Sequence, residues 1–338
     1  MSPNFDTVRI GSERLPVIGH RSVNGRRYLL LQELGSSGHG GRFRVFDPSA
    51  GLHGEQRRLL IMPRNRESEI QLRVLQRTRR HDHLFAHILD LQRCRDEFLV
   101  IMDWVPGPTL RHYLTEVKAC RVERPSVRET FRLGRDLARN LCKLHRLSFT
   151  VHGDLHPENL ILQRDSSRLV LIDFGSAWGL ETSARRFPGD GLRSIYSAPE
   201  LHDNGSAPQE FADQFVATLI FYEMLTLVVP YEGLGGKAGW PEHRDEMFSL
   251  FVPPSKLHPQ FLQVPVAVRD GIDRLVARGL AFSTTERYPT SRAWLEDLDR
   301  VWFSMNEPIQ RGGINDRVSY WIARIAAWLG MSIRESSK

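Results

Sequence analysis

Two short polar motifs, each beside an apolar run, constrain this chain more than any other feature. The first reads His152-Gly-Asp-Leu-His-Pro-Glu-Asn-Leu-Ile-Leu162 and the second reads Leu171-Ile-Asp-Phe-Gly175. The apolar residues predict short strands that can hold an acid, an amide and a second acid at the floor of a cleft. Asp154 can accept a proton from a hydroxyl, whereas Asn159 and Asp173 carry the hard oxygen ligands that magnesium prefers. Together the motifs indicate phosphoryl transfer, where catalysis is mostly positioning and charge neutralisation.

These motifs resemble the catalytic loop and the metal-binding loop of the protein kinases, whose patterns are H-R-D-L-x-x-x-N and D-F-G. Further family motifs follow in order. Tyr196-Ser-Ala-Pro-Glu200 matches A-P-E, and the apolar run from Asp213 to Thr226 resembles the family's central buried helix. Glu286-Arg-Tyr-Pro-Thr290 resembles the segment whose arginine pairs with the A-P-E glutamate. The chain is therefore identified as a divergent, bacterial-like member of the eukaryotic-type serine/threonine protein kinases.

The order of expected elements agrees with the fold that this resemblance implies. Strand signals dominate residues 25–103, and helical spacing dominates residues 104–303. Such segregation is typical of an α+β protein. We expect a bilobal kinase-like domain over 25–303, with a small antiparallel-sheet lobe, a larger helical lobe and the site in the crevice between them. Residues 1–24 are expected to form an N-terminal extension or a first edge strand, and residues 304–338 a C-terminal tail.

The resemblance also assigns structural roles to residues outside the site. It implies that Asp213 bonds the backbone of the catalytic loop. It further implies an ion pair between Glu200 and Arg287, which would tie the A-P-E segment to the end of the domain. Breaking such a pair by removing one partner is costly when the pair is buried.

ATP and Mg²⁺ are the cofactors that the resemblance implies, with Asn159 and Asp173 on the metal. A Gly-rich turn would cover the phosphates with its backbone amides. It keeps Gly35 and Gly40 of the family's G-x-G-x-x-G-x-V loop and includes Gly38, whereas Ser37 replaces the middle glycine. Arg42 stands where the family has a valine.

The expected hinge between the lobes is Asp103-Trp-Val-Pro-Gly107, which follows an apolar strand. Pro and Gly end that strand. By resemblance, Met102 would guard the back of the nucleotide pocket, and the backbones of Asp103 and Val105 would face adenine.

The strand expected to carry the family's phosphate-pairing lysine departs from the pattern. It reads Leu59-Leu-Ile-Met-Pro-Arg64, with Met62 at the expected place and Arg64 two positions further on. Because no lysine precedes Lys118, no shift of register supplies one. Arg64 is a candidate to reach the phosphates, although a planar guanidinium is not equivalent to a compact ammonium. Glu69 and Gln71 are the candidates for the helical residue that normally holds the lysine.

The catalytic loop reads His-Gly-Asp where most protein kinases have His-Arg-Asp. The missing arginine is the one that contacts a phosphorylated activation loop, so we expect that switch to be absent. His156 replaces the phosphate-contacting lysine of the loop, and it carries a full charge only below its pKa. The same His-Gly-Asp-Leu-His pattern occurs in aminoglycoside and choline kinases. A small-molecule kinase is therefore an alternative, against which the A-P-E segment, Asp213 and Arg287 count.

Composition bears on the partners and on the compartment. The formal net charge is +6, but no arginine-rich run is interleaved with aromatic residues, so we expect no nucleic-acid partner. The 3 cysteines are widely spaced and give neither a disulfide framework nor a zinc site. We expect neither a signal peptide nor a transmembrane segment, and hence a cytoplasmic protein.

The tail has its apolar residues on one helical stripe that includes Trp321 and Trp328. We expect an amphipathic helix that packs on the large lobe or docks a protein, with contact to a membrane surface as the alternative.

Two functional hypotheses from different classes follow. The first is an atypical serine/threonine protein kinase that binds ATP–Mg and transfers the γ-phosphate to a protein hydroxyl, which Asp154 orients and deprotonates. Arg64, Arg42 or His156 would supply part of the missing lysine's charge. The second is a pseudokinase that acts as a scaffold or regulator with weak or no catalysis. The missing lysine favours the second hypothesis, and the intact acid and metal ligands oppose it.

Overall fold

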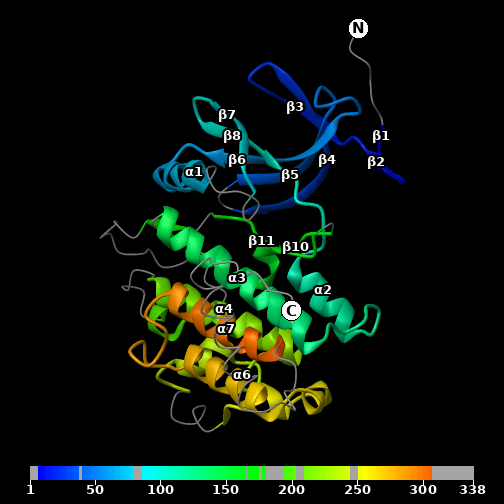
Figure 1. Cartoon of the computed structure of the whole chain (residues 1–338). Coiled ribbons are helices and arrows are strands. Elements are labelled where there is room, and N and C mark those ends of the chain that lie inside the picture. The colour runs from blue at the N-terminus through cyan, green and yellow to red at the C-terminus, as the bar shows by residue number, and fades with distance from the viewer. Residues whose placement is uncertain are drawn as a thin grey trace, which may run out of the picture.

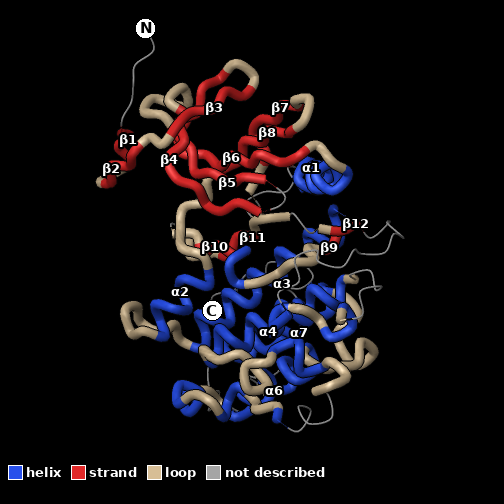
Figure 2. The backbone as a smooth tube through the Cα atoms, turned by 180° about the vertical axis from the view of Figure 1, so that it is seen from behind, coloured by secondary structure: helices blue, strands red, loops and turns tan. Residues whose placement is uncertain are grey.

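The expected bilobal α+β fold is confirmed. A strand-rich lobe lies above a helix-rich lobe in Figure 1, and Figure 2 shows the same division from behind. The computed structural model describes residues 7–37, 40–78, 86–148, 150–164, 166–174, 177–179, 194–202, 209–243 and 250–306.

A 6-stranded antiparallel sheet forms most of the small lobe, with strand order β3-β4-β5-β6-β8-β7. Its strands are β3 (Gly19–Val23), β4 (Arg26–Ser37), β5 (Gly40–Asp47), β6 (Glu55–Pro63), β7 (Ile88–Arg93) and β8 (Glu97–Asp103).

Strand β6 shows how alternation divides the sheet into two faces. Leu59 is buried on one face, in a cluster with Tyr28 and Val45. Leu60 and Met62 point to the other face and pack in the main core, which also contains apolar residues of helix α1 (Arg66–Thr78). The face that carries Leu60 and Met62 also carries Arg58, at the end of the strand nearer the hinge.

The first residues are more structured than an extension. A hairpin of β1 (Thr7–Ile10) and β2 (Glu13–Pro16) packs on the sheet, where Val8 lies in a cluster with Leu29. Strand β3 pairs with β4 along its whole length, so the edge-strand alternative describes residues 19–23. The remaining boundaries of the expected domain stay a prediction.

The large lobe is built around helix α4 (Glu210–Thr226), whose residues from Ala212 to Thr226 are all buried. A helix that is apolar on all sides belongs in a core, and the expected central helix is thereby confirmed. Helix α3 (Val127–Ser148) crosses it, and the rings of Phe131 and Phe221 meet edge to face at 5.2 Å. Around them lie α2 (Leu110–Lys118), α6 (Val266–Gly279) and α7 (Ser291–Asn306).

The segment between the lobes is fastened to the strand that follows the catalytic loop. Strand β10 (Leu160–Leu162) pairs with β11 (Leu169–Leu171), and Leu162 N–H donates to the Pro108 carbonyl at 3.0 Å. Gly107 has a φ of +149°, and a Cβ at this position would collide with the Leu162 carbonyl. Glycine is therefore required here, and the close approach fixes the hinge against the floor of the crevice.

None of the described helices is both long and apolar enough to cross a membrane. The expected amphipathic helix of the tail falls in residues 307–338, outside the described residues, and stays a prediction.

The expected ion pair between Glu200 and Arg287 is confirmed. Arg287 donates to both carboxylate oxygens of Glu200, at 2.8 and 2.9 Å. The same guanidinium donates to the carbonyls of Ala281 and Phe282 and lies 4.5 Å from the ring centre of Phe215. Its side chain is fully buried, so each of these acceptors depends on it for a donor.

Replacing Arg287 by methionine is expected to lower the free energy of unfolding by about 3 kcal/mol, because a carboxylate and two carbonyls lose their donors in the interior. Urea denaturation measures the change. Arg292→Met is the matched control, since its pair with Glu296 is more than half exposed; we expect a change below about 0.5 kcal/mol. Equal, small losses in both variants would contradict a structural role for the Glu200–Arg287 pair.

Candidate active site

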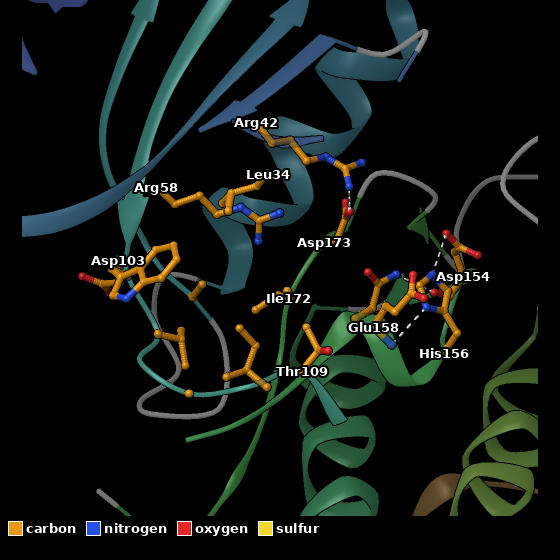
Figure 3. Close-up of a pocket in the computed structure, with 16 residues that line it drawn as sticks. Leu34, Arg42, Arg58, Asp103, Thr109, Asp154, His156, Glu158, Ile172 and Asp173 are labelled. Atoms are coloured by element: carbon orange, nitrogen blue, oxygen red, sulfur yellow. Dashed lines mark hydrogen bonds and ion pairs between the residues drawn. The ribbon is translucent and has the colours of Figure 1, made fainter. Parts of the chain in front are cut away.

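A cavity of about 850 Å³ opens between the two lobes (Figure 3). Leu34 from the sheet and Ile161 and Ile172 from the helical lobe give it apolar walls, and Trp104 closes the hinge side. The cavity is large enough for a nucleotide-sized ligand. The expected site residues that line it are Asp103, Val105, Asp154, His156, Asn159 and Asp173.

The catalytic loop is folded by its own hydrogen bonds. The Asn159 side-chain amide donates to the Asp154 carbonyl at 2.9 Å, and the Asn159 backbone N–H donates to the His156 carbonyl at 2.9 Å. These bonds turn the carboxylate of Asp154 toward the cavity, where it is 23% exposed. The buried imidazole of His156 has its Nε2 atom 3.7 Å from that carboxylate. An acid and a neighbouring imidazole thus share the rim of the cavity.

Asp213 holds this loop from below. One carboxylate oxygen accepts the backbone N–H of His152 at 2.6 Å, and the other accepts that of Gly153 at 3.1 Å. The expectation that Asp213 bonds the catalytic-loop backbone is confirmed. Gly153 has a φ of +74°, which suits glycine and explains in local terms why a side chain is absent at this position.

His145 at the end of α3 completes the support. Its Nε2 lies 2.9 Å from Asp213, and its Nδ1 lies 2.9 Å from the Ser291 hydroxyl and 3.6 Å from Glu210. Burial alone would lower the pKa of His145, but the hydrogen bonds and charges of Asp213 and Glu210 outweigh burial and raise it to about 8. Burial would raise the pKa of Asp213. The hydrogen bond and charge of His145, together with the contacts of His152, outweigh burial and lower it. The two groups therefore stabilise each other as an ion pair.

Asp173 stands at the end of the second motif, in the left-handed region with a φ of +65°. Asp tolerates this region better than most residues that have a side chain. Phe174 beside it is fully buried, with its ring 5.3 Å from that of His152. The ring contact links the two motifs. Asp154 and Asp173, one from each motif, both line the cavity (Figure 3).

Two arginines of the sheet reach into this cavity. Arg42 Nη1 lies 2.5 Å from Asp173 Oδ2. Arg58 is 9% exposed, and its Nε has no hydrogen-bond partner within the described residues. Burial lowers the pKa of Arg58, the charge of Asp173 opposes this effect, and the charge of Arg42 adds to it. In Figure 3 both guanidinium groups enter from the sheet, opposite the catalytic loop.

The sequence motifs miss Arg58. They place the position of the family's lysine at Met62 and make Arg64 the candidate cation, both further along the chain. Met62, expected at the place of the lysine, is 3% exposed and packs in the core. Arg64 is exposed, donates to the Cys94 carbonyl at 3.2 Å and does not line the cavity. The reason is the strand register, which pairs Arg58 with Met102 at the hinge. Arg58 lies on the same face as Met62, but β6 has left the cavity before it reaches Met62.

Helix α1 gives no acidic partner in the expected position at Glu69. This carboxylate lies 3.9 Å from Arg73 on the solvent side of the helix, where it is 44% exposed. The lysine–glutamate pair of the family therefore has no counterpart formed by Glu69.

The Gly-rich turn is the hairpin between β4 and β5, and Gly38 at its tip lies outside the described residues. Ser37 pairs with Gly40 where the hairpin closes. Gly40 has a φ of +114°, and a Cβ there would overlap the Ile61 carbonyl, so glycine is required by packing alone. Gly35 has a φ of +135° with open space around it. Among the described residues of this hairpin, Leu34 and Arg42 line the cavity.

The remaining hinge residues lie behind or beside the cavity. Met102 is buried in the main core behind it, where the family has its back-wall residue. The Asp103 backbone N–H donates to the His87 carbonyl at 3.0 Å, so this donor is used within the protein. Val105 lines the cavity directly.

The charges decide which ligand groups fit. The cavity lining carries four carboxylates, of Asp103, Asp154, Glu158 and Asp173, and two guanidinium groups, of Arg42 and Arg58. Both guanidinium groups lie near Asp173, where they locally favour an anion. Arginine forks match the oxygens of phosphate groups. Within the described residues, no cluster of three or more His, Cys, Asp or Glu is placed to hold a metal. As arranged here, the guanidinium of Arg42 occupies the Asp173 oxygen that a magnesium ion would need, and both arginines line the cavity, where they can contact phosphate.

Comparison with known proteins agrees with this architecture. A model of the protein kinase domain matches residues 58–296. Since the match covers most of the chain, this chain belongs to the protein kinase family.

Similar curated proteins are named as serine/threonine kinases. A probable serine/threonine-protein kinase of Clostridium perfringens is 23% identical over 68% of this chain. The serine/threonine-protein kinase PknD of Chlamydia abortus is 25% identical over 61% of it, and PrkC of Bacillus subtilis is 26% identical over 43%. The matched regions span 31%, 24% and 22% of these relatives, so what the relatives do as whole proteins does not carry over directly.

His145 makes a pH-dependent contribution to stability. Its pKa of about 8 in the folded protein exceeds the ordinary value of 6.5, so the contribution is complete below pH 6.5 and is lost as pH rises through about 8. We expect the free energy of unfolding to fall by roughly 2 kcal/mol over this interval. In His145→Asn this part of the pH dependence is expected to disappear. Urea titrations of both proteins at several pH values measure it, and parallel pH profiles would contradict the assignment.

Proposed function

We propose that this chain is an atypical serine/threonine protein kinase that takes ATP in the cleft and transfers its terminal phosphoryl group to a protein hydroxyl. One observation carries the proposal. The carboxylate of Asp154 lies at the rim of the cavity, on a loop that Asp213 and Asn159 hold by hydrogen bonds. A rigidly placed carboxylate facing a phosphate-binding cavity is what alignment of an acceptor hydroxyl requires.

In the proposed reaction, the acceptor hydroxyl donates a hydrogen bond to Asp154. Its oxygen forms a bond to the terminal phosphorus while the bond from that phosphorus to the oxygen of the leaving ADP breaks. The hydroxyl proton passes to Asp154. His156, 3.7 Å from this carboxylate, is placed to donate to a transferring phosphate oxygen. Arg42 and Arg58 neutralise phosphate charge from the opposite side of the cavity, where charge stabilisation supplies most of the catalysis.

The proposed nucleotide orientation follows from the walls of the cavity. The base would lie between Leu34 and the two isoleucines, Ile161 and Ile172, with Val105 of the hinge at its edge. The phosphates would then point toward Asp173 and the two arginines. Backbone amides of the Gly-rich hairpin would cover them, which retains Gly35, Ser37, Gly38 and Gly40 as proposed contacts. Asn159 and Asp173 face the same region, and metal binding by this pair requires that Arg42 release Asp173.

A serine or threonine of a protein is the proposed acceptor. The printed names of the relatives and the A-P-E segment with its Glu200–Arg287 pair support a protein acceptor over a small alcohol. A protein partner and a cytoplasmic location are part of the same proposal.

A pseudokinase is the second candidate, and a specific observation favours it. The carboxylate of Asp173 is paired with Arg42 at 2.5 Å, and Arg58 is the residue of β6 that lines the cavity, where the family has a lysine on this strand. In this alternative the cleft binds a nucleotide as a structural ligand, and no phosphoryl group is transferred.

Replacing Asp154 by asparagine is expected to lower phosphotransfer by about 100-fold to 10,000-fold, because the acceptor loses its base and its alignment. Nucleotide affinity is expected to stay within about threefold, since Asp154 faces the acceptor. Transfer of labelled phosphate from ATP to casein and to the chain itself measures the first effect, and calorimetric titration measures the second. Asp270→Asn on the exposed side of α6 is the matched control.

The outcomes separate the two candidates. Transfer by the wild-type chain that is lost in Asp154→Asn and kept in Asp270→Asn supports the kinase. Nucleotide binding by the wild-type chain without transfer to any acceptor supports the pseudokinase. Undiminished transfer by Asp154→Asn would overturn the role of this residue.

A further inference from the structure

Two arginines and one aspartate meet at one end of the cavity. Their charges bear on whether the nucleotide binds there with or without a metal ion. Arg42 comes from β5 and Arg58 from β6, and both point to the same end of the cavity as Asp173 (Figure 3). Arg42 is in direct contact with Asp173, and the charges of both residues influence Arg58. These three groups carry two positive charges and one negative charge, whereas Asp154 and Glu158 add negative charge on the catalytic-loop side of the cavity.

Arg58 shows that this unit is built to receive an anion. A charged side chain that is more than nine-tenths buried needs partners, because removing a charge from water is expensive. Its Nε has no hydrogen-bond partner among the described residues, although neighbouring strands fix the backbone of β6 on both sides. Arg58 lines the cavity, and Figure 3 shows its guanidinium inside it, so an anionic oxygen there would contact the terminal nitrogens and not the enclosed Nε. This buried, cavity-lining charge points to an anionic ligand independently of the Arg42–Asp173 contact.

We propose that this cleft binds the polyphosphate of its nucleotide in the metal-free form, with Arg42 and Arg58 taking the neutralising role of a divalent cation and of a lysine. The inference rests on the nucleotide-binding part of the proposed function, and it does not depend on phosphoryl transfer.

A divalent cation meets two obstacles at this position. It must displace the guanidinium of Arg42 from Asp173, which costs a charge-assisted contact of 2.5 Å. It must then lie near the fixed positive charge of Arg58, in a cavity where that charge is poorly screened by water. A metal-bound triphosphate also carries less negative charge, so the arginines attract it less. Magnesium is therefore expected to leave the affinity unchanged or to weaken it.

Phosphate oxygens can bind without removing Arg42 from Asp173. They can share the guanidinium of Arg42 with Asp173 and give the terminal nitrogens of Arg58 an acceptor. Both contacts join a guanidinium to a phosphate, which is a strong and directional pairing. The affinity should then increase with the number of phosphates in the order adenosine, AMP, ADP and ATP.

Calorimetric titration of the full chain with ATP, once in EDTA and once in excess MgCl₂, tests the inference. The wild-type dissociation constant in EDTA is expected to be equal to that in magnesium within about threefold, or tighter. Arg42→Ala is expected to weaken binding in EDTA by about 10-fold to 100-fold, and to recover part of the loss in magnesium because Asp173 is then released. Arg57→Ala, on the neighbouring position of β6 and paired with Glu55, is the matched control and is expected to match wild type.

Several results would overturn the inference. A wild-type affinity for ATP more than about tenfold weaker in EDTA than in magnesium would show that ATP binds together with a magnesium ion, which displaces Arg42 from Asp173. Equal affinities for adenosine and ATP would show that the arginines do not bind the phosphate groups. A wild-type chain that binds no nucleotide in either buffer overturns both this inference and the nucleotide site of the proposed function. Binding in EDTA, with no transfer to casein or to the chain itself in either buffer, supports this inference and overturns the kinase alone.

Arg58 provides a second readout within the same titration. Arg58→Lys keeps the positive charge but loses the planar guanidinium, and Arg58→Leu loses both. We therefore expect ATP to bind most tightly to wild type, less tightly to Arg58→Lys and most weakly to Arg58→Leu. Melting temperatures measured first identify a variant that fails to fold. In that case the partly exposed Arg42 carries the test, because its side chain is 35% exposed and its removal leaves the core intact.

Discussion

The buried carboxylate of Asp213 is the constraint on which the candidate active site depends. It lies on α4, the most deeply buried helix described, and accepts the backbone N–H groups of His152 and Gly153. A single ionised side chain thereby transmits the position of the helical core to the catalytic loop. His145 keeps that side chain charged in the interior, since each group shifts the pKa of the other in the direction that favours the pair. The orientation of Asp154 follows from this support.

The two sides of the cleft differ in how they depart from the family pattern. The helical side keeps Asp154, Asn159 and Asp173 in the order that the family motifs predict. All three line one cavity. The sheet side replaces a lysine with two arginines, Arg42 and Arg58, which come from different strands. A guanidinium is larger than an ammonium and binds phosphate as a fork. In the proposed complex these arginines bind the phosphates, and Arg42 contacts the oxygen of Asp173 that a metal ion would need.

The helical side was predictable from sequence because its groups lie close together along the chain and its fold is set by local hydrogen bonds. The motifs around Asp154, Asn159 and Asp173 give both the residues and their order. The sheet side was not predictable, because the position of each side chain depends on pairing between distant strands. Only the register of β6 with β8 shows that Arg58, and not Met62 or Arg64, lies beside Met102 at the start of the hinge. Likewise, the contact of Arg42 with Asp173 joins residues that no spacing rule connects.

In the proposed complex, arginines of the sheet hold the nucleotide phosphates above an intact catalytic loop. A crystal structure of the chain with a non-hydrolysable ATP analogue, grown in EDTA and again in MgCl₂, shows whether they do. We expect phosphate oxygens within hydrogen-bond distance of the guanidinium groups of Arg42 and Arg58 in both crystals, with no metal needed beside Asp173. Phosphates bound through a magnesium ion on Asn159 and Asp173, with Arg42 and Arg58 turned away from them, would contradict it.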